Sequence, residues 1–358
     1  MSASVFDHPW LGGLFGDPQM AEIWSAERQM AHMLAFEAAW SRALGACGRV
    51  DGDLAETAAS RIAAARIDLE DIRAGMAQDG VPVPRLVKQL QAVAGPDAAP
   101  AVHKGATSQD VVDSALALTL KDSTALLARR LAELEAALIE LDARQGETPL
   151  MGRTRMQAAT GITVSDRLRP WHQPLAAHLE RLAEIAPRVE RVQVGGASGD
   201  RKALGQDAQA VADHVAAELG LASAGAAWHA MRDGIADYAG LLSLVTGTLG
   251  KIGQDICLMA QQGLDEIKLS GGGGSSAMPH KQNPVGAELL VTLARFNAVQ
   301  LSAMHLALVH EQERSGAAWA LEWMILPQMA QATARALATA QGLVAGIDRI
   351  GTPERRTD

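Results

Sequence analysis

The chain has 358 residues, 48% of them hydrophobic, which suits a globular protein with a substantial core in two or three domains. Its formal charge of −9 is spread over alternating acidic and basic residues without a basic block, which argues against nucleic acid as a partner. Only two cysteines are present, outside any metal-binding spacing, and no apolar run reaches membrane-spanning length. We therefore expect a cytoplasmic protein with no disulfide framework, metal or membrane anchor.

The first part of the chain is expected to form a separate small domain. Residues 1–105 carry short segments of helical periodicity, interrupted by three glycines between positions 45 and 52 and by the sequence VPVP at 81–84. Because glycine and proline disfavour helix interiors, only short helices fit here. We predict a small helical N-terminal domain over residues 1–105.

A long helix is predicted over residues 106–145, which contain neither glycine nor proline. Leucines recur there every three, four or seven residues from Leu120 to Leu141, marking one apolar stripe on a helix of about 50 to 60 Å. Further helical segments are expected over 162–194, with kinks at three prolines, and over 231–269.

One more long helix is predicted over 285–313, directly after Pro284, a residue that favours helix starts. Helices of this length need neighbouring helices to bury their apolar stripes. The sequence therefore predicts an all-α fold in which a long-helix bundle spans residues 106–345 and a short tail follows at 346–358.

The glycine-rich sequence SGGGGSSAMPHKQNP, residues 270–284, interrupts this helical pattern. Glycines let the backbone approach a ligand, the amides of a helix start attract an anion, and Lys281 adds a positive charge at the same place. A flexible linker is the plain alternative, but linkers seldom continue into Met-Pro-His-Lys. The candidate residues of this loop are Ser275, Ser276, Met278, His280, Lys281 and Asn283.

A second candidate segment, HKGATSQDVVD, lies at the start of the longest predicted helix. Thr107 and Asp110 have the spacing of a capping box, which is a structural role. Capping leaves His103, Ser108 and Gln109 unexplained, and together with Thr107 they can offer hydrogen bonds to a ligand.

The sequence GRTRMQAAT, residues 152–160, is a third candidate segment. Arg153 and Arg155 can each bind a carboxylate through two hydrogen bonds, and Gln157 follows them in alternation. The alternative is a pair of solvated surface arginines.

A fourth segment, EQERSGAAWALEW, places Arg314 shortly before two tryptophans. Tryptophans at helical spacing are usually core residues, and we interpret Trp323 in that way. The remaining histidines, His229 among them, are isolated in the sequence and favour surface or core positions over ligand binding.

Together these segments resemble the fumarase and aspartase superfamily, whose signature is close to GSSAMPHKQNP. In that family three separated segments meet at each active site across a homotetramer with a central helical bundle. The resemblance implies that Ser275 and Lys281 are catalytic and that the other candidate residues bind substrate. It also implies that a C-terminal helical domain, usual in the family, is truncated or absent here.

Arg155 stands where fumarate-releasing members usually carry histidine, and in this the chain is similar to the carboxymuconate cycloisomerases. The run ERSGAAWALEW, the sequence LFGDPQM near Leu14 and the GGASG run from Gly195 resemble the same branch. The function implied is the cofactor-free lactonisation of a small tricarboxylate. A fumarate-releasing lyase and a non-catalytic scaffold of the same fold stay open as alternatives.

Overall fold

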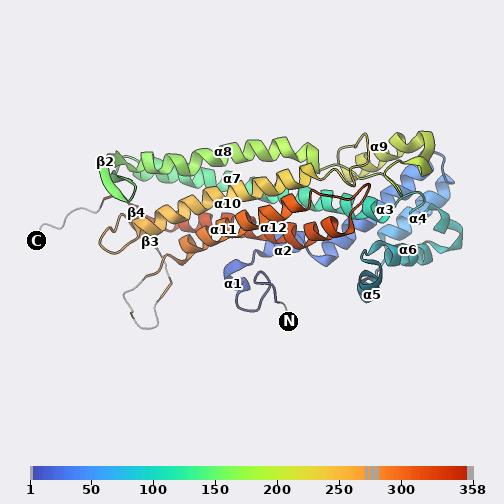
Figure 1. Cartoon of the computed structure of the whole chain (residues 1–358), viewed down its shortest axis with the longest axis horizontal. Helices are drawn as coiled ribbons and strands as arrows, with labels where there is room; N and C mark the ends of the chain where they lie inside the picture. The colour runs from blue at the N-terminus through green and yellow to red at the C-terminus, as the bar shows by residue number, and fades with distance from the viewer. Residues whose placement is uncertain (1–2, 271–272, 275–277, 279–281, 353–358) are drawn as a thin grey trace, which may run out of the picture.

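The computed structural model describes residues 3–270, 273–274, 278 and 282–352, and it is an elongated helical molecule (Figure 1). Long helices lie side by side along its length. Within the described residues they are α7 (Ser108–Gln145), α8 (Val164–Val189), α10 (Asp233–Met259), α11 (Val285–Leu306) and α12 (Gly316–Ala345).

Shorter helices gather at one end of this bundle, at the right of Figure 1. They are α3 (Ala26–Ala46), α4 (Gly52–Ala63), α5 (Leu69–Asp79), α6 (Val83–Ala98), η1 (Ala99–Ala101), η2 (Lys202–Asp207) and α9 (Ala208–Leu219). Two more, α1 (Gly12–Phe15) and α2 (Pro18–Ile23), precede them in the chain, and α2 contacts α7 and α12.

Buried apolar side chains of the described residues form two clusters. The larger one runs along the bundle, and the smaller one joins α3, α4 and α6 to residues 192–216, which come much later in the chain. The predicted boundary at residue 105 stays a prediction, but the core beside it also includes α9.

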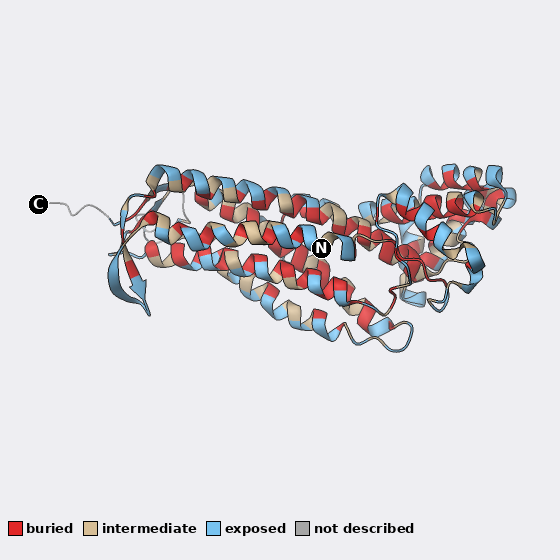
Figure 2. Cartoon of the chain, turned by 90° about the horizontal axis from the view of Figure 1, so that it is seen from above, coloured by how far each residue is buried: buried red, intermediate tan, exposed pale blue. Residues whose placement is uncertain are grey.

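The long helix predicted from the leucine pattern is confirmed as α7, and the leucines of its stripe between Leu120 and Leu141 are all buried. Figure 2 shows buried positions recurring along each helix of the bundle. Asp110 accepts a hydrogen bond from the backbone N–H of Thr107, 3.0 Å, as the capping box requires. Within the described residues, no helix combines the length and apolarity needed to cross a membrane.

Two predicted helices end earlier than expected. Helix α10 stops at Met259 because the chain turns at Gly263 and Asp265, whose φ angles of 89° and 50° are left-handed. Helix α11 stops at Leu306 rather than at residue 313. Helix α8, in contrast, continues through the three prolines as one element.

Two small antiparallel sheets at the far end of the bundle are absent from the sequence prediction. In one, β1 (Pro149–Thr154) pairs with β2 (Gln157–Thr163), and in the other β3 (Ile267–Leu269) pairs with β4 (Ile347–Ile350). The segment predicted as a tail from residue 346 therefore contributes a strand. The expectation of helix at 267–269 was wrong.

Helices α10 and α11 approach closely because glycines face the contact. A Cβ atom added at Gly253 would lie 2.5 Å from the Ala287 carbonyl oxygen and 2.7 Å from the Leu290 Cβ. Both distances are shorter than van der Waals contact allows, so the helices would have to separate.

We expect Gly253→Ala to lower the free energy of unfolding by roughly 1–3 kcal/mol, the usual cost of overpacking a core. Gly342→Ala is the matched control, because no atom lies within 4 Å of the added Cβ on α12. It should be neutral or stabilising by up to about 1 kcal/mol, since alanine favours helix. Urea unfolding of both variants measures the difference, and equal stabilities would contradict the close approach.

Candidate active site

The start of α7 is built around the carboxylate of Asp110, which is fully buried. It accepts hydrogen bonds from the backbone N–H groups of Gly195, 2.8 Å, and Gly196, 2.9 Å. His229 Nε2 lies 2.9 Å from the same carboxylate, so this nitrogen carries the proton. Asp110 thereby attaches the GGASG turn to the beginning of α7, where Thr107 and Ser108 are partly exposed.

His103 lies at the same end and pairs with Glu37 from α3. Its Nδ1 is 2.5 Å from Glu37 Oε1, and the histidine side chain is 17% exposed whereas the glutamate is buried. Burial by itself lowers the pKa of His103, but the Glu37 carboxylate outweighs burial and raises that pKa above its ordinary value. The pair places a potential positive charge beside the helix start.

Arg314 reaches this end from the loop between α11 and α12. Its Nε donates to Gln109 Oε1, 2.9 Å, and its Nη2 donates to the carbonyl of Ala197, 3.3 Å. The structure thus brings the second and fourth candidate segments together, although they are about two hundred residues apart in sequence. Gln109 is completely buried, and its side-chain oxygen and nitrogen both bind neighbours within the chain.

The third candidate segment forms the β1–β2 hairpin at the opposite end. Arg155 and Met156 make its two-residue turn, with left-handed φ angles of 49° and 67°. Asn-Gly is the pair that favours such a turn, and each non-glycine residue there costs roughly 1 kcal/mol. Arg155 and Gln157 are exposed, whereas Arg153 donates to the buried Glu266, 2.7 Å.

The glycine-rich loop joins the bundle at the hairpin's end (Figure 1). Gly273 and Asn283 exchange two backbone hydrogen bonds of 3.0 Å and close the base of the loop just before α11. Met278 is exposed. The candidates Ser275, Ser276, His280 and Lys281 lie outside the described residues.

Candidate residues of one chain consequently occupy two separate ends. The 38 residues of α7 span about 57 Å at 1.5 Å per residue, and α7 connects Thr107 at one end to the hairpin at the other. His103, Thr107, Ser108, Gln109 and Arg314 lie at the first end. Arg153, Arg155 and Gln157, in β1, β2 and their turn, and Asn283, just before α11, lie at the second.

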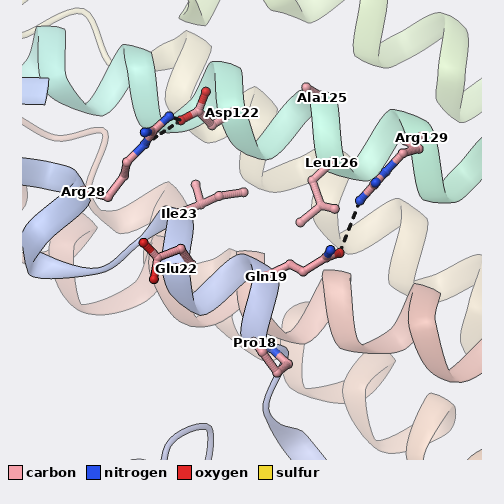
Figure 3. Close-up of a pocket in the computed structure, with 9 residues that line it drawn as sticks. All are labelled: Pro18, Gln19, Glu22, Ile23, Arg28, Asp122, Ala125, Leu126 and Arg129. Carbon is pink, nitrogen blue, oxygen red and sulfur yellow. Dashed lines mark hydrogen bonds and ion pairs between the residues drawn. The ribbon is translucent and has the colours of Figure 1, made fainter. Parts of the chain in front are cut away.

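One cavity lies away from both ends, along the middle of α7. It has a volume of about 710 Å³ and opens between α2 and α7 (Figure 3). Its arginines already have partners: Arg28 binds Asp122, 2.7 Å, and Arg129 binds Gln19, 3.2 Å. The lining also holds the carboxylates of Asp122 and Glu22, so its two arginines carry no excess positive charge for a tricarboxylate, and we do not place the substrate there.

Several buried residues near the first end were missed by sequence reasoning. His229 is not isolated but pairs with Asp110, and Arg232 lies between Asp113 and Glu322. The available signal was the clustering of polar residues within otherwise apolar helical segments. Trp323 is half-buried and packs edge to face on the buried Trp319, with ring centroids 4.7 Å apart.

Comparison with known proteins identifies the protein family to which this chain belongs. The sequence matches the lyase family over residues 15–299, and the chain belongs to that family. It is 37% identical to 3-carboxy-cis,cis-muconate cycloisomerase of Pseudomonas putida, over 97% of this chain and 83% of that protein. The enzyme of the same name from Pseudomonas aeruginosa is 40% identical, over 92% of this chain and 73% of its own length.

A solved structure agrees with the sequence comparison. The crystal structure of 3-carboxy-cis,cis-muconate lactonizing enzyme from Pseudomonas putida has a TM-score of 0.89 and 36% identity to this chain. The match covers 95% of this chain and 77% of that one. The predicted helical fold of the fumarase and aspartase type is thus confirmed, while the truncated or absent C-terminal domain stays a prediction.

The His103–Glu37 pair predicts a pH-dependent stability. Because the pKa of His103 is raised in the folded state, the pair stabilises fully below the unfolded value of about 6.5 and loses this effect as pH rises through the folded value. We expect wild type to exceed Glu37→Gln in melting temperature most at low pH, with the difference shrinking towards about pH 9.

Melting curves between about pH 5.5 and 9 measure this difference. Glu22→Gln, which changes an exposed glutamate on α2, is the control and should leave the pH dependence of wild type unaltered. A constant gap between wild type and Glu37→Gln over the whole range would show that His103 does not gain its proton affinity from Glu37.

Proposed function

We propose that this chain is a cycloisomerase that interconverts 3-carboxy-cis,cis-muconate and 4-carboxymuconolactone, a step of protocatechuate breakdown. The observation that carries the proposal is the 37–40% identity to proteins of that name over more than nine-tenths of the chain. Arg155 supports it further, because an exposed arginine at the hairpin turn replaces the histidine of fumarate-releasing relatives. An arginine binds a carboxylate well but does not release a proton near neutral pH.

The reaction joins a carboxylate oxygen of the substrate to an alkene carbon, and the neighbouring carbon then gains a proton. Negative charge accumulates on the carboxylate beside that second carbon before the proton arrives. Preorganised cations and hydrogen-bond donors placed there lower the barrier. We assign this role to Thr107, Ser108 and Arg314 at the first end, and to Lys281 and Asn283 in the glycine-rich loop.

Ser275 is our candidate for the proton donor, and in the reverse direction its alkoxide would remove the same proton. Lys281 would stabilise that alkoxide. The remaining candidates, His103, Arg153, Arg155, Gln157, Ser276, Met278 and His280, are assigned to substrate binding. The reaction needs no cofactor in this scheme, and the cytoplasmic location stays a prediction.

A complete site has to draw on more than one chain, because the two ends lie about 57 Å apart along α7. We propose a homotetramer in which the first end of one subunit meets the second end of others. Apolar side chains on the bundle surface support this: Leu244 on α10 is 54% exposed, and Val299 and Leu306 on α11 are 71% and 69% exposed. Such surfaces commonly mark subunit contacts.

The proposed chemistry is tested by following the diene absorbance of 3-carboxy-cis,cis-muconate with purified protein. We expect turnover by wild type and a loss of kcat on the order of a thousandfold or more in Ser275→Ala, with KM largely unchanged, because proton transfer is a transition-state role. Lys281→Met should impair both constants, since a cation near a carboxylate acts in the ground state and more strongly in the transition state.

Ser276→Ala is the comparison within the same loop: because we assign Ser276 to substrate binding, this variant should raise KM and keep kcat near that of wild type. A larger loss of kcat in Ser276→Ala than in Ser275→Ala would show that Ser275 is not the proton donor. Efficient cleavage of adenylosuccinate or argininosuccinate by wild type would favour a fumarate-releasing lyase, and no turnover of any of these substrates would favour a scaffold.

The shared site predicts complementation between two inactive variants. Arg155→Ala removes a group from the second end and Arg314→Ala removes one from the first, so each homotetramer has four damaged sites. In mixed tetramers about a quarter of the sites combine an intact first end with an intact second end, because each site draws its ends at random from two kinds of chain. Activity near a quarter of wild type should therefore return.

Refolding the two variants together at equal concentration, beside each variant refolded alone, measures this recovery. Sites assembled within single chains would show no recovery in the mixture.

A further inference from the structure

The guanidinium of Arg314 is held on one side only. Its Nε and Nη2 donate to Gln109 Oε1 and to the Ala197 carbonyl, 2.9 and 3.3 Å away, and its Nη1 has no hydrogen-bond partner among the described residues. Gln109 is the nearer and better placed of the two acceptors. The direction in which Arg314 presents its remaining N–H groups therefore depends on how the Gln109 amide is oriented.

The orientation of that amide is fixed by its other neighbours. Gln109 Nε2 donates to Asp113 Oδ2, 3.0 Å, and to the backbone carbonyl of His229, 2.9 Å. The Asp113 carboxylate and the His229 carbonyl both act as hydrogen-bond acceptors here. A flipped amide would set its oxygen against these two acceptors and its NH₂ group against the Arg314 donor, so Oε1 has to face Arg314.

Asp113 is kept in this acceptor state by a buried cluster. Arg232 donates to both of its oxygens, at 2.7 and 3.2 Å, and Trp319 Nε1 donates to Oδ1, 3.1 Å. Gln193 Nε2 adds a longer contact of 3.3 Å to Oδ2. With the bond from Gln109, five donors surround the two oxygens of Asp113, which therefore acts as an acceptor in every one of these contacts.

Arg232 is itself buried and bridges to a second carboxylate. Its Nε and Nη2 donate to the two oxygens of Glu322, 2.9 and 2.5 Å, so the guanidinium binds both acids side by side. Burial opposes the charge of Arg232, but Asp113 and Glu322 outweigh it and raise its pKa above the ordinary value. The cluster contains two carboxylates, Asp113 and Glu322, and one guanidinium, that of Arg232. The positive charge of Arg314, bound through Gln109, balances the second carboxylate.

We propose that Gln109 and Arg232 are positioning residues for the cycloisomerase reaction. Arg232 holds the Asp113 carboxylate in place, Asp113 sets the Gln109 amide, and Gln109 Oε1 fixes the Arg314 guanidinium for a substrate carboxylate. The sequence pattern favours substrate binding by Gln109. We assign it instead to orienting Arg314, because both of its side-chain polar atoms are hydrogen-bonded to residues of the chain. It rests on the proposed function for the identity of the substrate, but not for the geometry.

A double-mutant cycle tests the connection. Gln109→Met keeps the side-chain length but has no hydrogen bond for Arg314, and we expect it to raise KM for 3-carboxy-cis,cis-muconate about tenfold, the loss of one charged hydrogen bond. In an Arg314→Ala background the same change should have little further effect, because the group that it orients is gone. A purely structural defect would instead reduce the folded fraction, lowering kcat and leaving KM unchanged.

Asp113→Asn is a second variant that preserves shape while removing the acceptor-only constraint on the Gln109 amide. It should raise KM in the same way and lose its effect when Arg314 is absent. Gln91→Met, on the exposed surface of α6, is the matched control and should leave both constants at wild-type values. Independent effects of Gln109→Met and Arg314→Ala, multiplying in kcat/KM, would overturn the proposal.

Crystal structures of the Gln109→Met and Asp113→Asn variants separate this inference from the proposed function. We expect the Arg314 guanidinium to leave its wild-type position in both, and an unchanged Arg314 would overturn the positioning role whatever the activity. If wild type does not convert the carboxymuconate, the proposed function fails, and the position of Arg314 in these structures still decides the inference.

Discussion

The uninterrupted length of α7 is the constraint on which the rest of the molecule depends. Residues Ser108–Gln145 form one helix of about 57 Å, so the polar groups at its two ends cannot meet within one chain. The other bundle helices are shorter, at 22 to 30 residues, and together they bury its leucine stripe. In the homotetramer that we propose, a neighbouring subunit brings its hairpin turn to the start of α7.

At the first end, two acids three residues apart organise the surroundings. Asp110 binds the GGASG turn and His229, whereas Asp113 binds Arg232 and Gln109. Buried charges are costly unless each is paired and hydrogen-bonded, and each oxygen of these two carboxylates has at least two donors. Such a cluster adds little stability compared with apolar packing, but it admits one arrangement of its members, which is what an orienting role requires.

Much of the fold could be predicted because periodicity reports burial directly. The leucines between Leu120 and Leu141 are buried as expected, and the capping box at Thr107 is present. The hairpin was missed because Arg155 and Met156 occupy turn positions that sequence patterns assign to Asn and Gly. Arg232 contacts residues that are 90 and 119 positions away in the sequence. Periodicity and short motifs report local structure, so they do not reveal which distant groups meet. The catalytic roles of Ser275 and Lys281 come from the family resemblance.

The left-handed backbone at Arg155 and Met156 has a consequence for how the protein can change. Glycine at position 156 would relieve the turn, and so would asparagine at position 155, so mutations that improve folding are readily available at the tip of the hairpin. The asparagine would also remove the exposed cation. In the homotetramer that we propose, Arg155 serves a site completed by another subunit, so one chain bears the cost of the turn and its neighbour gains the cation.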